Sequence, residues 1–161
     1  VRGVARPPSP ARRQAEALRA AGLAVELFVF HGGRSLYNYA IAWTRLRHRF
    51  RAHRYDLVHA HFAPTGLLAL PKRIPLIVTL RRSDVGAHSA ADRPPGHLRR
   101  LSQAAARLLV RRADAVIVPS EEARRGLRTR TPVHVIPPEL EEPALTARLL
   151  EVYRSVLGTG P

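Results

Sequence analysis

The sequence predicts a single α/β domain in which a mostly parallel sheet carries helices on both faces. Short apolar runs rich in β-branched residues alternate with longer segments whose apolar residues recur every three or four positions. Gly, Pro or charged residues separate the two kinds of segment. The 161 residues suit one domain, because domains are commonly about 100 to 200 residues long. This order of elements is typical of Rossmann-like domains.

Five apolar runs are expected to form the strands of the sheet. Each is short and ends at a glycine, a proline or a charged residue, as buried parallel strands do. The runs comprise residues 24–30, 56–60, 74–80, 115–119 and 133–136, and residues 1–5 form a less regular sixth.

The segments between these runs predict amphipathic helices. Within residues 36–52, the residues Leu36, Ala40, Trp43, Leu46 and Phe50 recur at helical spacing. Further helices are expected over residues 11–21, 98–112, from 121 onward and from 143 onward, with Ser9 and Ser120 as N-caps.

The last predicted helix needs an apolar partner. Leu145, Leu149 and Val152 form a stripe on it, and an isolated helix of this length is marginal in water. We therefore expect residues 1–138 to form the Rossmann-like domain, and residues 139–161 to form a linker and a helix that packs back on it.

Basic residues dominate the charge. Lys and Arg total 27 against 12 Asp and Glu, and the net charge of +15 favours phosphate groups, anionic lipid or nucleic acid as partners. Every basic residue except Lys72 is an arginine, so the codon preference of a GC-rich genome is an alternative explanation. Specific nucleic-acid recognition is not expected, because no known motif occurs and aromatic residues make up only 6%.

Several function classes are excluded or disfavoured by composition. Cysteine is absent, which excludes disulfides and thiolate metal sites. Neither metal-ligand spacing nor a hydrolase motif occurs, so no metal or cofactor is expected. The apolar stretches are far shorter than the roughly 20 residues that cross a bilayer. We therefore expect a cytoplasmic protein whose membrane contact is at most peripheral, on anionic lipid at the inner membrane face.

Several stretches are similar to a known family. They are "RRQAEALRAAGLAVELFVFHGGRS", "YDLVHAHF", "PLIVTLRRSDVG" and "RRADAVIVPSEEARRGL" followed by "PVHVIPPEL". In order and spacing, these stretches resemble the N-terminal domain of retaining, family-four-type glycosyltransferases with the GT-B fold. The resemblance covers residues 12–138. It implies a domain that chiefly binds acceptor and that faces a second domain, which binds the nucleotide-sugar donor.

The chain differs from this family in three respects. The segment after Pro137 is too short for the donor-binding domain, although "LTARLLEVYRSVL" resembles the family's final helix, which packs back on the N-terminal domain. The first loop, "ARPPSPARRQ", lacks the family's glycines and therefore cannot form a comparable anion-binding nest. In "RRSD", Arg82 replaces a glycine and offers a phosphate-binding fork instead.

Ligands of open α/β sheets bind beyond the carboxyl ends of the strands. His59 and His61 face the same side of one strand. His61, at the exit, is a catalytic candidate that either binds a sugar hydroxyl or phosphate or simply caps the strand. Asp84 is the second catalytic candidate, because it could orient an acceptor hydroxyl. A salt bridge within its loop is the alternative.

The remaining candidates would bind substrate or phosphate. Arg81 and Arg82 offer forks for phosphate charge. His88 is either a proton carrier or a solvated loop residue, and the start of the helix after Ser120 either binds an anion or is simply capped. The binding candidates are Arg81, Arg82, Ser83, His88, Ser120 and Glu121.

These residues and the resemblance predict a glycosyltransferase-like domain of hexosyltransferase type. It would bind a sugar-containing acceptor, and with a nucleotide sugar it would transfer the sugar. One domain supplies one wall of the cleft, and a homodimer could supply the other. The alternatives are a non-catalytic module that binds anionic membranes or nucleic acid by charge, and an inactive scaffold.

Overall fold

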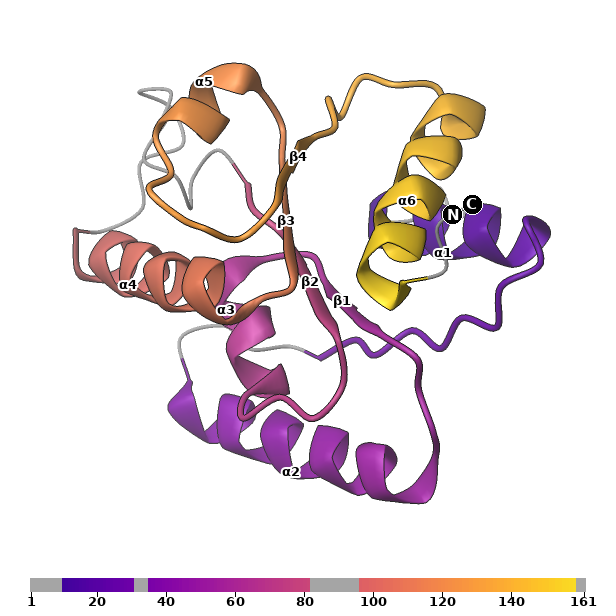
Figure 1. Cartoon of the computed structure of the whole chain (residues 1–161). Coiled ribbons are helices and arrows are strands. Elements are labelled where there is room, and N and C mark those ends of the chain that lie inside the picture. The colour runs from indigo at the N-terminus through magenta and orange to yellow at the C-terminus, as the bar shows by residue number, and fades with distance from the viewer. Residues whose placement is uncertain (1–9, 31–34, 82–95, 159–161) are drawn as a thin grey trace, which may run out of the picture.

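The structure of the chain, a computed structural model, describes residues 10–30, 35–81 and 96–158, and the side chains of 11–30, 35–81 and 103–158. In these residues, four parallel strands form one sheet between helical layers (Figure 1). The strands are β1 (Val58–Ala60), β2 (Leu76–Thr79), β3 (Ala115–Val118) and β4 (Val133–Val135), in the order β1-β2-β3-β4. The expected α/β class with a parallel sheet is confirmed.

The helices cover both faces of the sheet. They are α1 (Pro10–Ala20), α2 (Leu36–Ala52), α3 (Ala63–Gly66), the 3-10 helix η1 (Leu67–Ala69), α4 (Gly96–Arg112), α5 (Glu121–Arg125) and α6 (Glu142–Leu157). In Figure 1, α3 and α4 lie on one side of the sheet, and α1 and α6 lie on the other. No helix in the described ranges is both long and apolar enough to cross a membrane.

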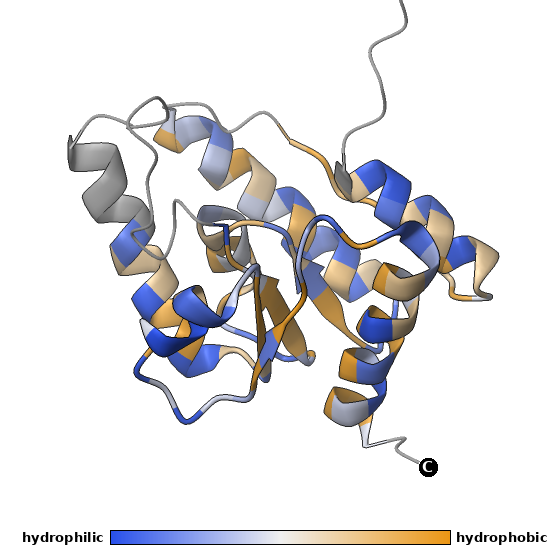
Figure 2. Ribbon diagram, turned by 90° about the horizontal axis from the view of Figure 1, so that it is seen from above, coloured by the Kyte–Doolittle hydropathy of each residue, from blue (hydrophilic) through white to orange (hydrophobic). Residues whose placement is uncertain are grey.

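Two apolar clusters hold these layers together. Successive strand residues point to opposite faces, so β2 and β3 contribute to both clusters. On one face, Leu76, Val78 and Val116 pack against Leu109 of α4. Strand β3 is therefore apolar throughout, and orange predominates in the middle of the sheet in Figure 2. The cluster on the other face contains Leu18, Ile77, Ala115, Ile117, Ile136, Leu149, Val152 and Tyr153.

Helix α6 belongs to the second cluster. Leu149 and Val152 are buried, and Leu145 packs beside them. The helix also lies against α1. It ends at Gly158, whose positive φ of 68° suits glycine. The stripe expected to need a partner therefore packs against the sheet and α1.

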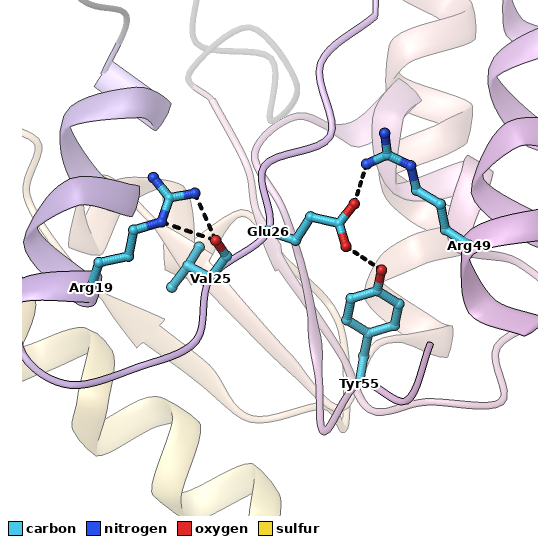
Figure 3. A network of polar contacts seen from close by, with 5 residues as sticks. All are labelled: Arg19, Val25, Glu26, Arg49 and Tyr55. Carbon is cyan, nitrogen blue, oxygen red and sulfur yellow. Dashed lines mark hydrogen bonds and ion pairs between the residues drawn. The ribbon is translucent and has the colours of Figure 1, made fainter. Parts of the chain in front are cut away.

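The prediction of a strand over residues 24–30 is wrong. In the described residues this segment forms neither helix nor strand, and it is not part of the four-stranded sheet. Figure 3 shows side chains that hold it instead: Arg19 donates to the Val25 carbonyl from Nε and Nη2 at 3.0 and 2.6 Å, and Arg49 and Tyr55 bind the carboxylate of Glu26. The sixth run, residues 1–5, lies outside the described residues.

Helix α2 does not bury the whole apolar stripe that the sequence predicted. Its buried residue is Ala42, whereas Leu36 is 79% exposed and Trp43 is 41% exposed. The helix is anchored by polar contacts: the Trp43 indole donates to the Leu70 carbonyl at 3.2 Å, and Arg47 donates to the carbonyls of Leu68 and Pro71. Helix α2 therefore leaves part of its apolar stripe in solvent.

Candidate functional site

The candidate site lies at the carboxyl edge of the sheet. His61 follows β1, Arg81 follows β2 and Ser120 follows β3. Because the three strands run in the same direction, the residues that follow them emerge at the same edge. The register pairs Ala60 with Val78 and so brings the ends of β1 and β2 together.

Two histidines are stacked at this edge. The rings of His59 and His61 have centroids 4.4 Å apart and an interplanar angle of 24°. Both side chains project from the face of the sheet that carries α6, since residues two apart in a strand share a face. His59 is held from both sides: its Nδ1 lies 2.7 Å from the Tyr153 hydroxyl, and its Nε2 lies 2.7 Å from the Thr79 hydroxyl.

Both histidines are neutral near pH 7. Burial lowers the pKa of His59 well below its ordinary value of 6.5, and repulsion from a protonated His61 would lower it further. Burial, followed by the positive charge of Arg81, lowers the pKa of His61 to about 4. A neutral imidazole has one donor and one acceptor nitrogen, so His61 can hydrogen-bond a hydroxyl in either sense.

Arg81 places a cation beside the neutral His61. Its guanidinium carbon lies 5.0 Å from the centroid of the Phe62 ring. The side chain is exposed, and its charge acts on His61. The edge therefore combines a hydrogen-bonding imidazole with a guanidinium, which binds phosphate or carboxylate well.

The comparisons with known proteins identify the family. The model of Glycosyltransferase Family 4 matches residues 1–138. The chain belongs to glycosyltransferase family 4. The fold of this glycosyltransferase-family domain is similar to a solved structure of sucrose-phosphate synthase from Thermosynechococcus elongatus, with a TM-score of 0.60 and 18% identity over 90% of this chain and 92% of that chain. No curated protein matches the sequence.

The structure brings only some of the predicted site residues together. His61 and Arg81 are brought together. Ser120 caps α5, because its Oγ accepts a hydrogen bond from the Ala123 amide at 3.2 Å. Glu121 forms an ion pair with Arg124 at 3.2 Å and lines a hollow beside β4. The remaining candidates, Arg82, Ser83, Asp84 and His88, lie outside the described residues.

Sequence reasoning missed Tyr153 and Thr79. Tyr153 is buried on α6, and burial raises the pKa of its hydroxyl, while a hydrogen bond with Gln14 of α1 opposes the rise. Tyr153 follows Leu149 by four residues and so shares its apolar face. That spacing indicates burial, but the contact with His59 depends on how α6 packs across the sheet.

Proposed function

We propose that this chain is the acceptor-side half of a glycosyltransferase and that it binds a sugar-containing acceptor at the carboxyl edge of its sheet. The observation that carries the proposal is the neutral His61 beside the cationic Arg81. Family membership and the site of ligands in open α/β sheets support the same edge. In this proposal, residues 1–138 are the binding domain and residues 139–161 are a returning linker and helix.

His61 serves as a hydrogen-bonding residue rather than as the proton acceptor. A base with a pKa of about 4 takes up a proton poorly near pH 7, where an efficient general base has a pKa close to the operating pH. A neutral imidazole can orient a sugar hydroxyl through one hydrogen bond. The proposed catalytic carboxylate is therefore Asp84, with His61 orienting the acceptor.

Arg81 supplies charge for a phosphate group. Its guanidinium can donate hydrogen bonds to two phosphate oxygens, and the aromatic ring of Phe62 supports it from one side. Arg82, Ser83 and His88 are proposed to add contacts to the same group. A phosphate-bearing ligand, either a nucleotide sugar or a phosphorylated acceptor, fits this combination of groups.

To hold the donor nucleotide sugar for transfer, a second protein surface must face this edge and form the opposite wall of the cleft. A facing domain would supply that wall, and a homodimer is the arrangement in which this chain alone would supply it. Transfer would follow once acceptor hydroxyl and donor carbon lie in contact, because positioning two reactants removes much of the barrier. This half by itself therefore provides binding contacts, and transfer requires the second wall.

Titration calorimetry with a series of nucleotide sugars and phosphorylated sugars tests the proposal. We expect at least one such ligand to bind, and Arg81→Ala to weaken its binding about 10- to 150-fold, as the loss of a charged hydrogen bond does. Arg128→Ala is the matched control, since Arg128 is an exposed arginine in the loop that precedes β4. Equal losses in both variants would indicate binding by diffuse charge. No binding to any ligand in the series would indicate an inactive scaffold.

Helix α2 is the surface best suited to a second function, contact with an anionic membrane. Leu36 and Tyr37 are 79% and 72% exposed at its N-terminal end, and Arg45 and Arg51 are exposed further along. Apolar residues that enter the interface and arginines that attract anionic headgroups are the two requirements for peripheral binding. Such contact would hold the domain at an anionic lipid surface.

A further inference from the structure

The outer edge of β4 carries unused backbone hydrogen-bonding groups. Hydrogen bonds to β3 use alternate residues: the Val116 amide donates to the Pro132 carbonyl, and the Ile136 amide donates to the Val118 carbonyl, both at 2.9 Å. The amides and carbonyls of Val133 and Val135 therefore point away from the sheet. In the described part of the chain they have no hydrogen-bond partner. A strand edge of this kind is a template for pairing with another strand.

A hollow of about 280 Å³ runs along this edge between α5 and α6. His134 of β4 lines it, and the ring Nε2 of His134 is buried without a hydrogen-bond partner. Buried polar atoms are rarely left unpaired, because desolvation without a hydrogen bond costs free energy. The edge thus combines open backbone groups with an unpaired side-chain nitrogen.

The charges that flank the hollow are self-complementary. On α6, Arg148 and Glu151 form an ion pair at 3.3 Å, and on α5, Arg124 and Glu121 form one at 3.2 Å. All four side chains line the hollow and are more than half exposed. Each helix therefore presents one positive and one negative charge, one turn apart, beside the open edge.

We propose that β4 pairs with β4 of a second copy of this chain, antiparallel and around a two-fold axis perpendicular to the sheet. In this register Val133 exchanges hydrogen bonds with Val135 of the partner subunit, and His134 lies opposite His134 of the partner subunit. Such an axis keeps each face of the sheet on its own side, so α6 meets α6 and α5 meets α5.

The two-fold axis explains why a second copy fits better than another partner. Two α6 helices related by the axis are antiparallel, so Arg148 faces Glu151 of the partner subunit and Glu151 faces Arg148 of the partner subunit. The same reciprocity holds for Arg124 and Glu121 on the other face. Isologous interfaces require a surface that complements itself, and these two ion pairs have that property.

This pairing does not rest on the proposed function. It leaves the carboxyl edges with His61 and Arg81 uncovered, and antiparallel pairing turns the two edges in opposite directions. The second copy bound at β4 is therefore not the opposite wall of the proposed cleft. Loss of pairing and loss of sugar binding are separate outcomes, since they depend on different edges of the sheet.

Sedimentation velocity of the 161-residue chain over a concentration series tests the pairing at about 0.15 M salt, where the repulsion between two strongly basic copies is screened beyond about 8 Å. We expect a dimer that dissociates on dilution. Val135→Pro removes an outward amide while the ladder to β3 keeps its donors, and should weaken dimerisation at least about tenfold. In the wild type, hydrogen exchange at the amides of Val133 and Val135 should slow as concentration rises.

A charge exchange supplies the matched control. Glu151→Arg places like charges across the axis and should weaken dimerisation, whereas the double variant Arg148→Glu/Glu151→Arg restores opposite charges and should recover it. Recovery also shows that the altered α6 still folds. A chain that stays monomeric at every concentration, or a dimer unaffected by Val135→Pro, would overturn the proposal. A dimer that dissociates only when His61 or Arg81 is substituted would also overturn the proposal. Such a dimer would form through the carboxyl edge of the sheet and not through β4.

Discussion

The hydroxyl of Tyr153 lies 2.7 Å from Nδ1 of His59 and links α6 to β1 across 94 residues of sequence. The Thr79 hydroxyl holds the other ring nitrogen, and the ring stacks on His61. One buried contact therefore joins the C-terminal helix to the candidate site. This arrangement makes the position of His61 depend on α6.

Tyr153→Phe should destabilise the domain by about 1 to 3 kcal/mol, because it leaves a buried nitrogen of His59 without its partner. The free energy of unfolding from urea denaturation measures the effect. Tyr37→Phe is the matched control, since Tyr37 is 72% exposed and should lose less than about 0.5 kcal/mol. Equal losses in the two variants would show that the buried hydrogen bond contributes nothing measurable.

Stability should fall as the pH decreases from 6.5 towards 4. The folded-state pKa of His61 is about 4 and that of His59 is also lowered, while both have the ordinary value of 6.5 when unfolded. Between these values the unfolded chain binds more protons, so acid favours unfolding. His61 alone should account for a loss on the order of 1 to 3 kcal/mol by pH 4.

The pH dependence is measured by denaturation at a series of pH values in wild type and in His61→Gln. The variant should show a shallower loss below pH 6.5. His48→Gln, which changes an exposed histidine of α2, should keep the wild-type slope. An unchanged slope in His61→Gln would contradict the assignment of this titration to the stacked pair.

Leu149→Ala should cost about 2 to 5 kcal/mol, because it opens a cavity where α6 packs on the sheet. Leu157→Ala removes a side chain that is 38% exposed and should cost much less.

Deleting the chain from Pro143 onward should lower the melting temperature sharply or cause aggregation. A deletion variant with an unchanged melting temperature would show that α6 is dispensable.

Binding to anionic vesicles should weaken steeply with salt, because a spread of arginines attracts the surface through screened charge. Co-sedimentation with anionic and zwitterionic vesicles, from low to high salt, measures this. Leu36→Ser should reduce binding further if α2 enters the interface, whereas Leu157→Ser on α6 should not. Association that persists well above physiological salt would indicate insertion or a specific lipid site instead.

The sequence allowed the strands with two buried faces to be predicted well. Residues 115–118 are apolar without interruption, and burial on both faces requires that pattern. The run 24–30 is apolar apart from Glu26, yet it stays outside the sheet, and Arg19, Arg49 and Tyr55 bind the Val25 carbonyl and the Glu26 carboxylate. Such side-chain contacts come from other parts of the fold, so composition alone could not distinguish the two cases.

The candidate site was partly predictable for a related reason. Parallel strands bring the residues after β1 and β2 to one edge, so the proximity of His61 and Arg81 follows from topology. The contact between His59 and Tyr153 depends instead on how α6 crosses the sheet. The capping role of Ser120 was one of two readings that the sequence left open, and the backbone geometry of α5 shows the cap.

The role of the carboxyl edge is tested most directly by amide chemical shifts during titration with nucleotide sugars and phosphorylated sugars. We predict shifts at His61, Phe62 and Arg81 that are lost in Arg81→Ala and retained in Ser120→Ala, which should lose only about 1 kcal/mol of stability with its cap. Shifts confined to other regions, such as the arginines near Thr129, or shifts at this edge that persist in Arg81→Ala, would contradict the assignment.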